Sequence, residues 1–392
     1  MYILFYRYGS ICEPDVISGF QELGCKIHEL TVETTHKTLS AATRVQLLCA
    51  ELLADSYDCI FSINYFPFIS EVANIFKIRY ICWTVDSPVM DLFADSVKHP
   101  WNRIFCFDSA QYNDIVARNP SCIFHLPLAT NPARWNRIIS NATPKQITTF
   151  RGDISFVGSL YSEKCPFNRL TDAPDYLQGY LNAIMDAQQQ VFGYYFLEDV
   201  LPEEIVLEFK NHLPGFYTPP ENHIHNDCIS MARLYLCPQI TVNERTHIMH
   251  LLGSHFSVNL YTGSNTTDLP VNNCGLAKTL TEMPLIFHHS KINLNLTTKS
   301  IRSGLPLRIF DILGCGGFLL TNYQQELFSY FKPGEDLVYY TNDDDLLQKT
   351  EFYLTHEKER KEIALNGFET VKKHHNYPER LAKMLVLAFG NS

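Results

Sequence analysis

The segment 303–317 has the residue types best suited to hold a charged ligand. It reads Ser-Gly-Leu-Pro-Leu-Arg-Ile-Phe-Asp-Ile-Leu-Gly-Cys-Gly-Gly, which predicts a Gly-Pro turn, a short helix and a tight turn into a strand. The free N–H groups and the positive dipole end of such a helix suit a pyrophosphate. Arg308 and Asp311 lie one turn apart, so a cation for phosphates and a carboxylate for a ribose diol could share one face. A helix start and turn that serve only packing fit the same pattern.

Two further places in the C-terminal half are candidates for phosphate binding. Gly158 and Ser159 directly follow a predicted strand, and a glycine there lets the backbone approach a diphosphate closely. An ordinary turn between a strand and a helix fits them equally well. Arg245 is predicted to open the helix that leads into a strand at 256–261. This arginine could bind phosphate or lie exposed on the helix surface.

The N-terminal half has its clearest candidate at Asp86. The run 83–88 ends a buried strand with a carboxylate and a proline turn, the position at which open α/β sheets expose functional groups. Asp86 could hold an acceptor or a transferred group, or it could cap a helix at 89–93. Asn64 and Tyr65, after the preceding strand, carry the same ambiguity.

Short apolar runs alternate with amphipathic segments along the whole chain, which predicts βαβ units and parallel sheets. The first series has predicted strands at 2–6, 26–30, 57–63, 80–83, 103–107 and 122–125. The second has predicted strands at 154–157, 256–261, 285–287, 292–295 and 317–320. We therefore predict an α/β fold of two tandem Rossmann-like domains, with their strand ends facing each other across a central cleft.

The composition of residues 131–151, rich in Asn, Pro, Thr and Ser, is typical of a linker. We place an N-terminal, acceptor-binding domain at 1–148 and a C-terminal, nucleotide-binding domain at 149–377. The second contains a mostly helical insertion at about 166–236. Residues 378–392 are predicted to form a final helix that packs back on the N-terminal domain.

Length, charge and cysteine usage limit the function classes. The 392 residues suffice for two domains, and a net charge of -10 without a basic stripe argues against a nucleic-acid partner. The chain shows neither a leader sequence nor an apolar run of about 20 residues, so we expect a cytoplasmic protein with no transmembrane segment. Twelve scattered cysteines predict reduced thiols, and no metal site is expected. The acidic run Asp343–Asp345 precedes a helical pattern, so helix capping explains it better than metal binding.

Residues 285–385, with the 303–323 segment at their centre, resemble the C-terminal domain of the CgeB-like (spore maturation protein) glycosyltransferases. These are GT-B enzymes related to the family 4 retaining glycosyltransferases. The runs 153–160, 245–263 and 83–88 are similar to the same family, so the resemblance covers most of the chain and is weakest at 166–236.

The resemblance implies roles for individual residues. Family 4 enzymes have two glutamates eight positions apart, the first near the donor sugar and the second on the ribose. Asp311 stands at the second position and Ser303, a departure, at the first. Arg308 matches a basic residue of the CgeB-like branch, and Arg302 or Lys299 would add positive charge. The nucleotide sugar is thus expected to contact the set Gly158, Ser159, Arg245, Arg302, Ser303, Gly304, Leu305, Arg308 and Asp311.

These observations predict transfer of a sugar from a nucleotide-diphosphate donor, a UDP-sugar above all, to a protein or glycan acceptor. Arg308 and Asp86 are the predicted catalytic residues. Arg308 and backbone N–H groups would stabilise the leaving diphosphate without a metal ion or other cofactor, while retention of configuration is implied only by the resemblance. A sugar-nucleotide epimerase and a catalytically silent nucleotide-sugar-binding subunit are the alternatives. The base, sugar, acceptor and any homo-oligomer stay open.

Overall fold

The computed structural model describes residues 1–36 and 38–390, and the chain divides into two compact units. Unit 1 comprises residues 1–130 and 220–224 together with the C-terminal segment from His375. Unit 2 comprises residues 131–219 and 225–374. Each unit contains one six-stranded parallel sheet covered by helices, so the predicted pair of Rossmann-like domains is confirmed.

The sheet of unit 1 has the order β2-β1-β3-β4-β5-β6. Its topological switch point, where the strand order reverses, lies between β1 and β3. The strands are β1 (Tyr2–Tyr6), β2 (Lys26–Leu30), β3 (Cys59–Ile63), β4 (Arg79–Trp83), β5 (Asn102–Cys106) and β6 (Ile123–His125). The main helices are α1 (Glu13–Glu22), α3 (Ala41–Ala54), α4 (Pro67–Phe76) and α5 (Ser109–Ile115).

The last helix, α17 (Tyr377–Phe389), also belongs to unit 1 and packs against α1. Gly19 of α1 makes this contact possible, because a Cβ there would lie 2.7 Å from Leu381 Cδ1. At the other end of α17, Arg103 Nε donates a hydrogen bond of 3.1 Å to the Ala388 carbonyl. The C-terminal segment therefore completes the helical cover of this unit.

The sheet of unit 2 has the order β12-β11-β10-β7-β8-β9, with the switch point between β7 and β10. The strands are β7 (Gly152–Val157), β8 (Val258–Tyr261), β9 (Asn272–Asn273), β10 (Ser290–Asn295), β11 (Leu319–Asn322) and β12 (Val338–Tyr340). Helices α11 (Cys237–His255) and α15 (Asp343–Thr355) contact each other. A second contacting group consists of α12 (Met283–His289), α13 (Leu307–Gly314) and α16 (Glu357–His374).

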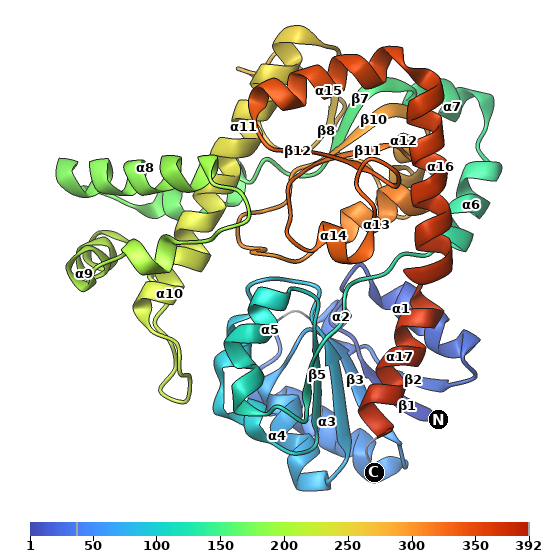
Figure 1. Ribbon diagram of the computed structural model, residues 1–392. Helices are drawn as coiled ribbons and strands as arrows, with labels where there is room; N and C mark the ends of the chain where they lie inside the picture. Colours follow the sequence, from blue (N-terminus) through green and yellow to red (C-terminus); the bar gives the residue numbers. More distant parts are fainter. Residues whose placement is uncertain (37, 391–392) are drawn as a thin grey trace. The chain divides into compact units, whose positions relative to one another are not determined.

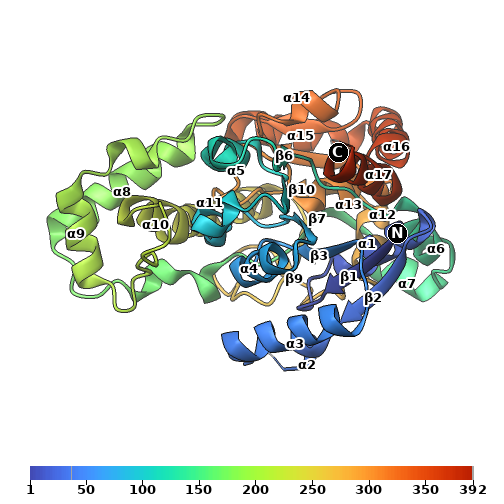
Figure 2. The ribbon, with the colours of Figure 1, turned by 90° about the horizontal axis from the view of Figure 1, so that it is seen from below.

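A helical lobe stands between β7 and β8 in the sequence. It contains α8 (Asp175–Gln190), α9 (Glu203–His212) and α10 (Asp227–Met231), and it has a hydrophobic core of its own. Figures 1 and 2 both show α8 and α9 on one side of unit 2 and α6 and α16 on the other. Helix α11 belongs to both parts, since Cys237 and Ile240 lie in the core of the lobe whereas Met249 and Leu252 lie in the core of the sheet.

Two segments differ from the sequence prediction. Residues 285–287 are not a strand but the middle of α12, and they read as a short apolar run because the helix is buried from Met283 to Phe287. The predicted linker holds two helices, α6 (Pro132–Ser140) and α7 (Pro144–Phe150). Asn131 and Thr143 cap these helices and a proline follows each cap, so a linker-like composition marks helix starts here. Unit 2 accordingly begins at residue 131 instead of 149.

Candidate functional site

Arg245 spans the switch point of unit 2. One guanidinium nitrogen, Nη1, donates to the Ser159 carbonyl after β7 at 2.6 Å, and Nη2 donates to the Leu296 carbonyl after β10 at 2.5 Å. Arg245 lies in the middle of α11 and is only 3% exposed. The predictions that it opens a helix, or lies on the helix surface, are therefore wrong. Its position ties together the two strand ends between which ligands of doubly wound sheets bind.

Arg308 reaches the same place from the opposite side of the switch point. It lies in the first turn of α13, and its Cζ is 5.6 Å from the centroid of the Phe156 ring, while Arg245 Cζ is 5.4 Å from the same ring. Within the described chain, Arg308 has no hydrogen-bond or ion-pair partner, and its Nε is buried. The two guanidinium groups thus lie near the same aromatic ring, and no carboxylate forms a hydrogen bond with either of them in the described part of the chain.

Burial shifts the titration of both arginines. Desolvation, followed by the positive charge of Arg308, lowers the pKa of Arg245 to about 10. Desolvation also lowers the pKa of Arg308. Both side chains still carry their charge near neutral pH. Because the charged form is disfavoured by burial and by the second cation, an anion bound between the arginines would relieve the cost.

Gly158 is required by the approach of Arg308. Its φ of +155° favours glycine, and a Cβ built there would lie 3.0 Å from Arg308 Nη2 and 3.3 Å from Cζ. Ser159 directs its hydroxyl to Glu163 Oε1 at 2.7 Å. The structure therefore brings together four of the predicted residues at the end of β7: Gly158, Ser159, Arg245 and Arg308.

The turn before α13 is largely buried. Ser303 Oγ donates to Glu326 Oε1 at 3.0 Å, and Gly304 and Leu305 follow it toward the first residue of the helix, Leu307. Asp311 lies one turn after Arg308 and is 6% exposed. Arg302 is placed differently, with its Cζ 5.6 Å from the Tyr195 ring of the lobe. It therefore contacts the lobe and not Phe156.

Lys299 does not add free charge to the site. Its Nζ forms an ion pair of 2.7 Å with Glu244 Oε1, and both side chains are mostly buried. Burial raises the pKa of Glu244. Sequence analysis missed this pair, because no local pattern relates residues on α11 and on the loop after β10.

Asp86 lies at the carboxyl end of β4 in unit 1 and is exposed. Asn64 Nδ2 donates to Asp86 Oδ2 at 2.7 Å and to the Tyr8 hydroxyl at 3.0 Å. Burial raises the pKa of Tyr8 to about 12. The helical turn at Met90–Phe93 has Val89 at its N-cap and no side-chain cap, so the capping role considered for Asp86 is wrong. These side chains form a polar group beside the switch point of unit 1.

The loop after β1 contains a second feature that sequence analysis missed. Glu13 Oε1 accepts hydrogen bonds from the backbone N–H groups of Tyr8, Gly9 and Ser10 at 2.9, 2.9 and 3.0 Å. Its other oxygen, Oε2, pairs with Arg7 Nε at 2.9 Å. Successive backbone N–H groups of this kind form an anion-binding concavity, and here the protein's own carboxylate fills it.

Among the described residues, no group of three or more His, Cys, Asp or Glu side chains is placed to hold a metal ion. Within the same part of the chain, no helix combines the length and apolar character needed to cross a membrane.

Comparisons with known proteins agree with this architecture. Residues 249–386 match a family model described as glycosyl transferase-like. No curated protein sequence matches the chain.

Several solved structures are similar over nearly the whole chain. HepE of Anabaena in complex with UDP-glucose has a TM-score of 0.56 at 10% identity and covers 98% of each chain. A glycosyltransferase from Rickettsia africae has a TM-score of 0.53 at 10% identity, over 100% of this chain and 99% of that one. Sucrose-phosphate synthase of Thermosynechococcus elongatus has a TM-score of 0.52 at 10% identity, over 100% of both. The chain thus has the GT-B fold of glycosyltransferases, with a glycosyl transferase-like segment at residues 249–386.

Proposed function

We propose that this protein is a glycosyltransferase that takes a sugar from a nucleotide-diphosphate donor and passes it to a protein or glycan acceptor. The observation that carries the proposal is the pair Arg245 and Arg308, which converge over Phe156 at the switch point of unit 2. The buried Arg245 and the partly buried Arg308, beside a glycine turn, suit a diphosphate, whose oxygens carry negative charge and can accept hydrogen bonds from side chains and backbone. The family match, which includes Arg308 and Asp311, supports the same reading.

A UDP-sugar is the donor we favour. HepE and the T4 phage enzyme BGT, which has a TM-score of 0.50 at 10% identity, are both solved with UDP-glucose. The CgeB-like resemblance of the 303–323 segment supports a retaining outcome. A cytoplasmic location and a homo-oligomer stay predictions.

In the proposed reaction, the bond between the anomeric carbon and the diphosphate oxygen breaks, and its electron pair stays on the diphosphate. The acceptor hydroxyl forms the new bond to the anomeric carbon and loses its proton to solvent. Arg308 would stabilise the growing charge on the leaving group, because it has no partner of its own among the described residues. A metal ion is not needed for this role. Asp86, on unit 1, would hold the acceptor or the transferred sugar.

Asp311 is the proposed ribose ligand. It lies one turn beyond Arg308, where a carboxylate and a cation could serve the two ends of a nucleoside diphosphate. Asp311→Ala should weaken nucleotide binding by about 1–3 kcal/mol, the scale of a lost hydrogen bond to a charged group. Unchanged affinity in a folded variant would remove Asp311 from the site.

A thermal-shift panel with UDP, GDP, dTDP, ADP and CMP tests the proposal. A nucleotide that binds only the folded protein raises its melting temperature, and we expect the largest rise with UDP. The rise should vanish in the Arg245→Ala/Arg308→Ala double variant. If no nucleotide shifts the wild-type melting temperature, the donor assignment is wrong. Binding without turnover would support a silent subunit, and conversion of a nucleotide sugar without an acceptor would support an epimerase.

A further inference from the structure

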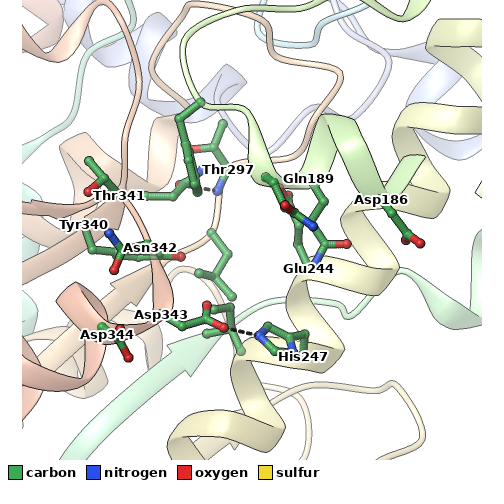
Figure 3. A pocket seen from close by; sticks show the side chains of 15 residues that line it. Asp186, Gln189, Glu244, His247, Thr297, Tyr340, Thr341, Asn342, Asp343 and Asp344 are labelled. Atoms are coloured by element: carbon green, nitrogen blue, oxygen red, sulfur yellow. Dashed lines mark hydrogen bonds and ion pairs between the residues drawn. The ribbon is translucent and has the colours of Figure 1, made fainter. Parts of the chain in front are cut away.

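Unit 2 contains a cavity that is separate from the arginine site. It has a volume of about 690 Å³ and lies at the carboxyl ends of β10, β11 and β12, where α8 and α11 face the start of α15. Figure 3 shows Glu244 and His247 facing Asn342 and Asp343 across it, with Asp186 at its edge. A volume of this size is typical of small-molecule sites.

The charge of this cavity is opposite to that of the arginine site. Four carboxylates line it: Asp186, Glu244, Asp343 and Asp344. His247 Nε2 lies 2.6 Å from Asp343 Oδ2, and no lysine or arginine is among the described lining residues. Glu244 is paired with Lys299, which leaves Asp186 and Asp344 as the lining carboxylates without an ion-pair or histidine partner among the described residues. Because these carboxylates repel phosphate, a nucleotide diphosphate is a poor occupant. The carboxylates would instead accept hydrogen bonds from a ligand with several donors.

Asn322 provides a donor that the protein leaves unused. The residue is 7% exposed and lines the cavity at the end of β11. Its Oδ1 accepts a hydrogen bond from the Thr297 N–H at 3.0 Å, whereas its Nδ2 has no partner in the described part of the chain. An amide donor that lines a cavity and has no protein partner is available to a ligand or to solvent.

Apolar side chains complete the lining. Phe192 presents an aromatic ring, and Leu296 and Ile248 lie at the ends of β10 and within α11. The cavity adjoins the arginine site at Leu296, which lines the cavity and whose carbonyl oxygen accepts from Arg245, but neither arginine is among the lining residues. The occupant must therefore combine several hydroxyl donors, at least one acceptor and an apolar face.

We propose that this cavity binds a neutral sugar ring, at a site distinct from the diphosphate site at Arg245 and Arg308. Sugar hydroxyls would donate to the carboxylates, one hydroxyl oxygen would accept from Asn322 Nδ2, and the C–H face would pack against Phe192. This inference stands apart from the proposed transfer reaction, because sugar binding can be measured without a donor nucleotide.

Ligand-detected NMR on the full chain tests the inference, with glucose, galactose and N-acetylglucosamine as probes. We expect at least one to bind and to remain bound in the presence of saturating UDP and in Arg308→Ala. Asn322→Asp keeps the acceptor for Thr297 and removes the free donor, and Asp344→Asn removes one lining charge. Each variant should weaken binding about tenfold, the scale of one hydrogen bond to a charged group.

Glu351→Gln is the matched control, since it removes an exposed carboxylate from the same helix, α15, outside the lining. It should bind sugar as the wild type does. The inference is overturned if no neutral sugar binds, if UDP displaces the sugar, or if Glu351→Gln weakens binding as much as Asp344→Asn. Equal melting temperatures of the three variants would show that the losses are local. A failure here leaves the thermal-shift result with UDP untouched, so the two proposals are tested separately.

Discussion

The loops that follow β1 and β7 occupy equivalent places in two similar sheets, yet they differ in the charges that they present. After β1, Glu13 fills the ring of backbone N–H groups and also pairs with Arg7. After β7, Gly158 leaves room for the unpaired Arg308, and Arg245 lies beside it. One loop carries its own anion, and the other presents two cations without one.

The difference in charge shows how two units of the same fold can bind different ligands. Strand order places both loops at switch points, so topology alone would predict ligand binding in both units. The local charge distinguishes them, because an occupied anion site cannot accept a phosphate. Under the proposed function, unit 2 would bind the diphosphate, and an uncharged group would bind near Asn64 and Asp86 in unit 1.

The largest expected effect follows removal of Arg308. Arg308→Ala should lower kcat on the order of 100-fold or more, by analogy with the loss of one oxyanion donor, while nucleotide affinity falls less. Arg308→Lys should recover little, because lysine lacks the planar two-pronged donor. Steady-state kinetics with UDP-sugar hydrolysis measures both variants until the acceptor is known. If kcat stays within a few-fold of wild type, Arg308 is not a catalytic residue, and the two cations after β7 do not distinguish the function of unit 2.

Replacing Glu13 should make the loop after β1 able to bind an anion, as we propose for the loop after β7. Glu13→Ala leaves three backbone donors and Arg7 without their shared carboxylate, which should cost about 3 kcal/mol of unfolding free energy. Chemical denaturation measures the loss. Added phosphate should then stabilise the variant more than the wild type, because the concavity is open. Equal phosphate effects on both proteins would mean that this loop is not an anion site.

Adding a methyl group at Gly158 tests whether the close contact between this residue and Arg308 matters for binding. Gly158→Ala should destabilise the protein by about 1–3 kcal/mol through backbone strain and should also weaken UDP binding by displacing Arg308. Gly24 is the control, since its φ is +79° and an added Cβ meets no atom within 4 Å. Gly24→Ala should show the strain alone, with UDP affinity unchanged in isothermal titration. Weaker UDP binding in both variants would indicate a general loss of folding.

The smallest change in stability is expected at Asp86. Asp86→Asn keeps an oxygen acceptor for Asn64, and the residue is exposed, so the unfolding free energy should change by less than about 0.5 kcal/mol. We expect slower transfer to the acceptor and unchanged donor hydrolysis, because the proposed role concerns the acceptor or the transferred sugar. An equal drop in both rates would place Asp86 in the donor site.

Much of the fold could be predicted from the sequence, because buried parallel strands read as apolar runs. The strands at 2–6 and 26–30 have the bounds that the structure shows. The prediction failed at 285–287, where a helix buried on all sides gives the same short run. It also failed at 131–151, since Asn, Thr and Pro serve helix caps as often as linkers.

The site could be predicted only in part. Glycine turns and arginines are visible as residue types, so Gly158, Arg245 and Arg308 could be named as candidates. Their partners are set by tertiary contacts, because Ser159 and Leu296 are 86 and 51 residues from the arginine that joins them. The pairing of Lys299 with Glu244 arises in the same way, across 55 residues. The Glu13 concavity is local in sequence, but composition gives no sign of it because the loop conformation creates it.

Helix α11 acts as a stiff rod between the lobe and the sheet. Its first turns are anchored in one hydrophobic core and its last turns in the other, and Arg245 lies between the two anchors. The position of Arg245 therefore depends on the packing of α11 in both the lobe and the sheet.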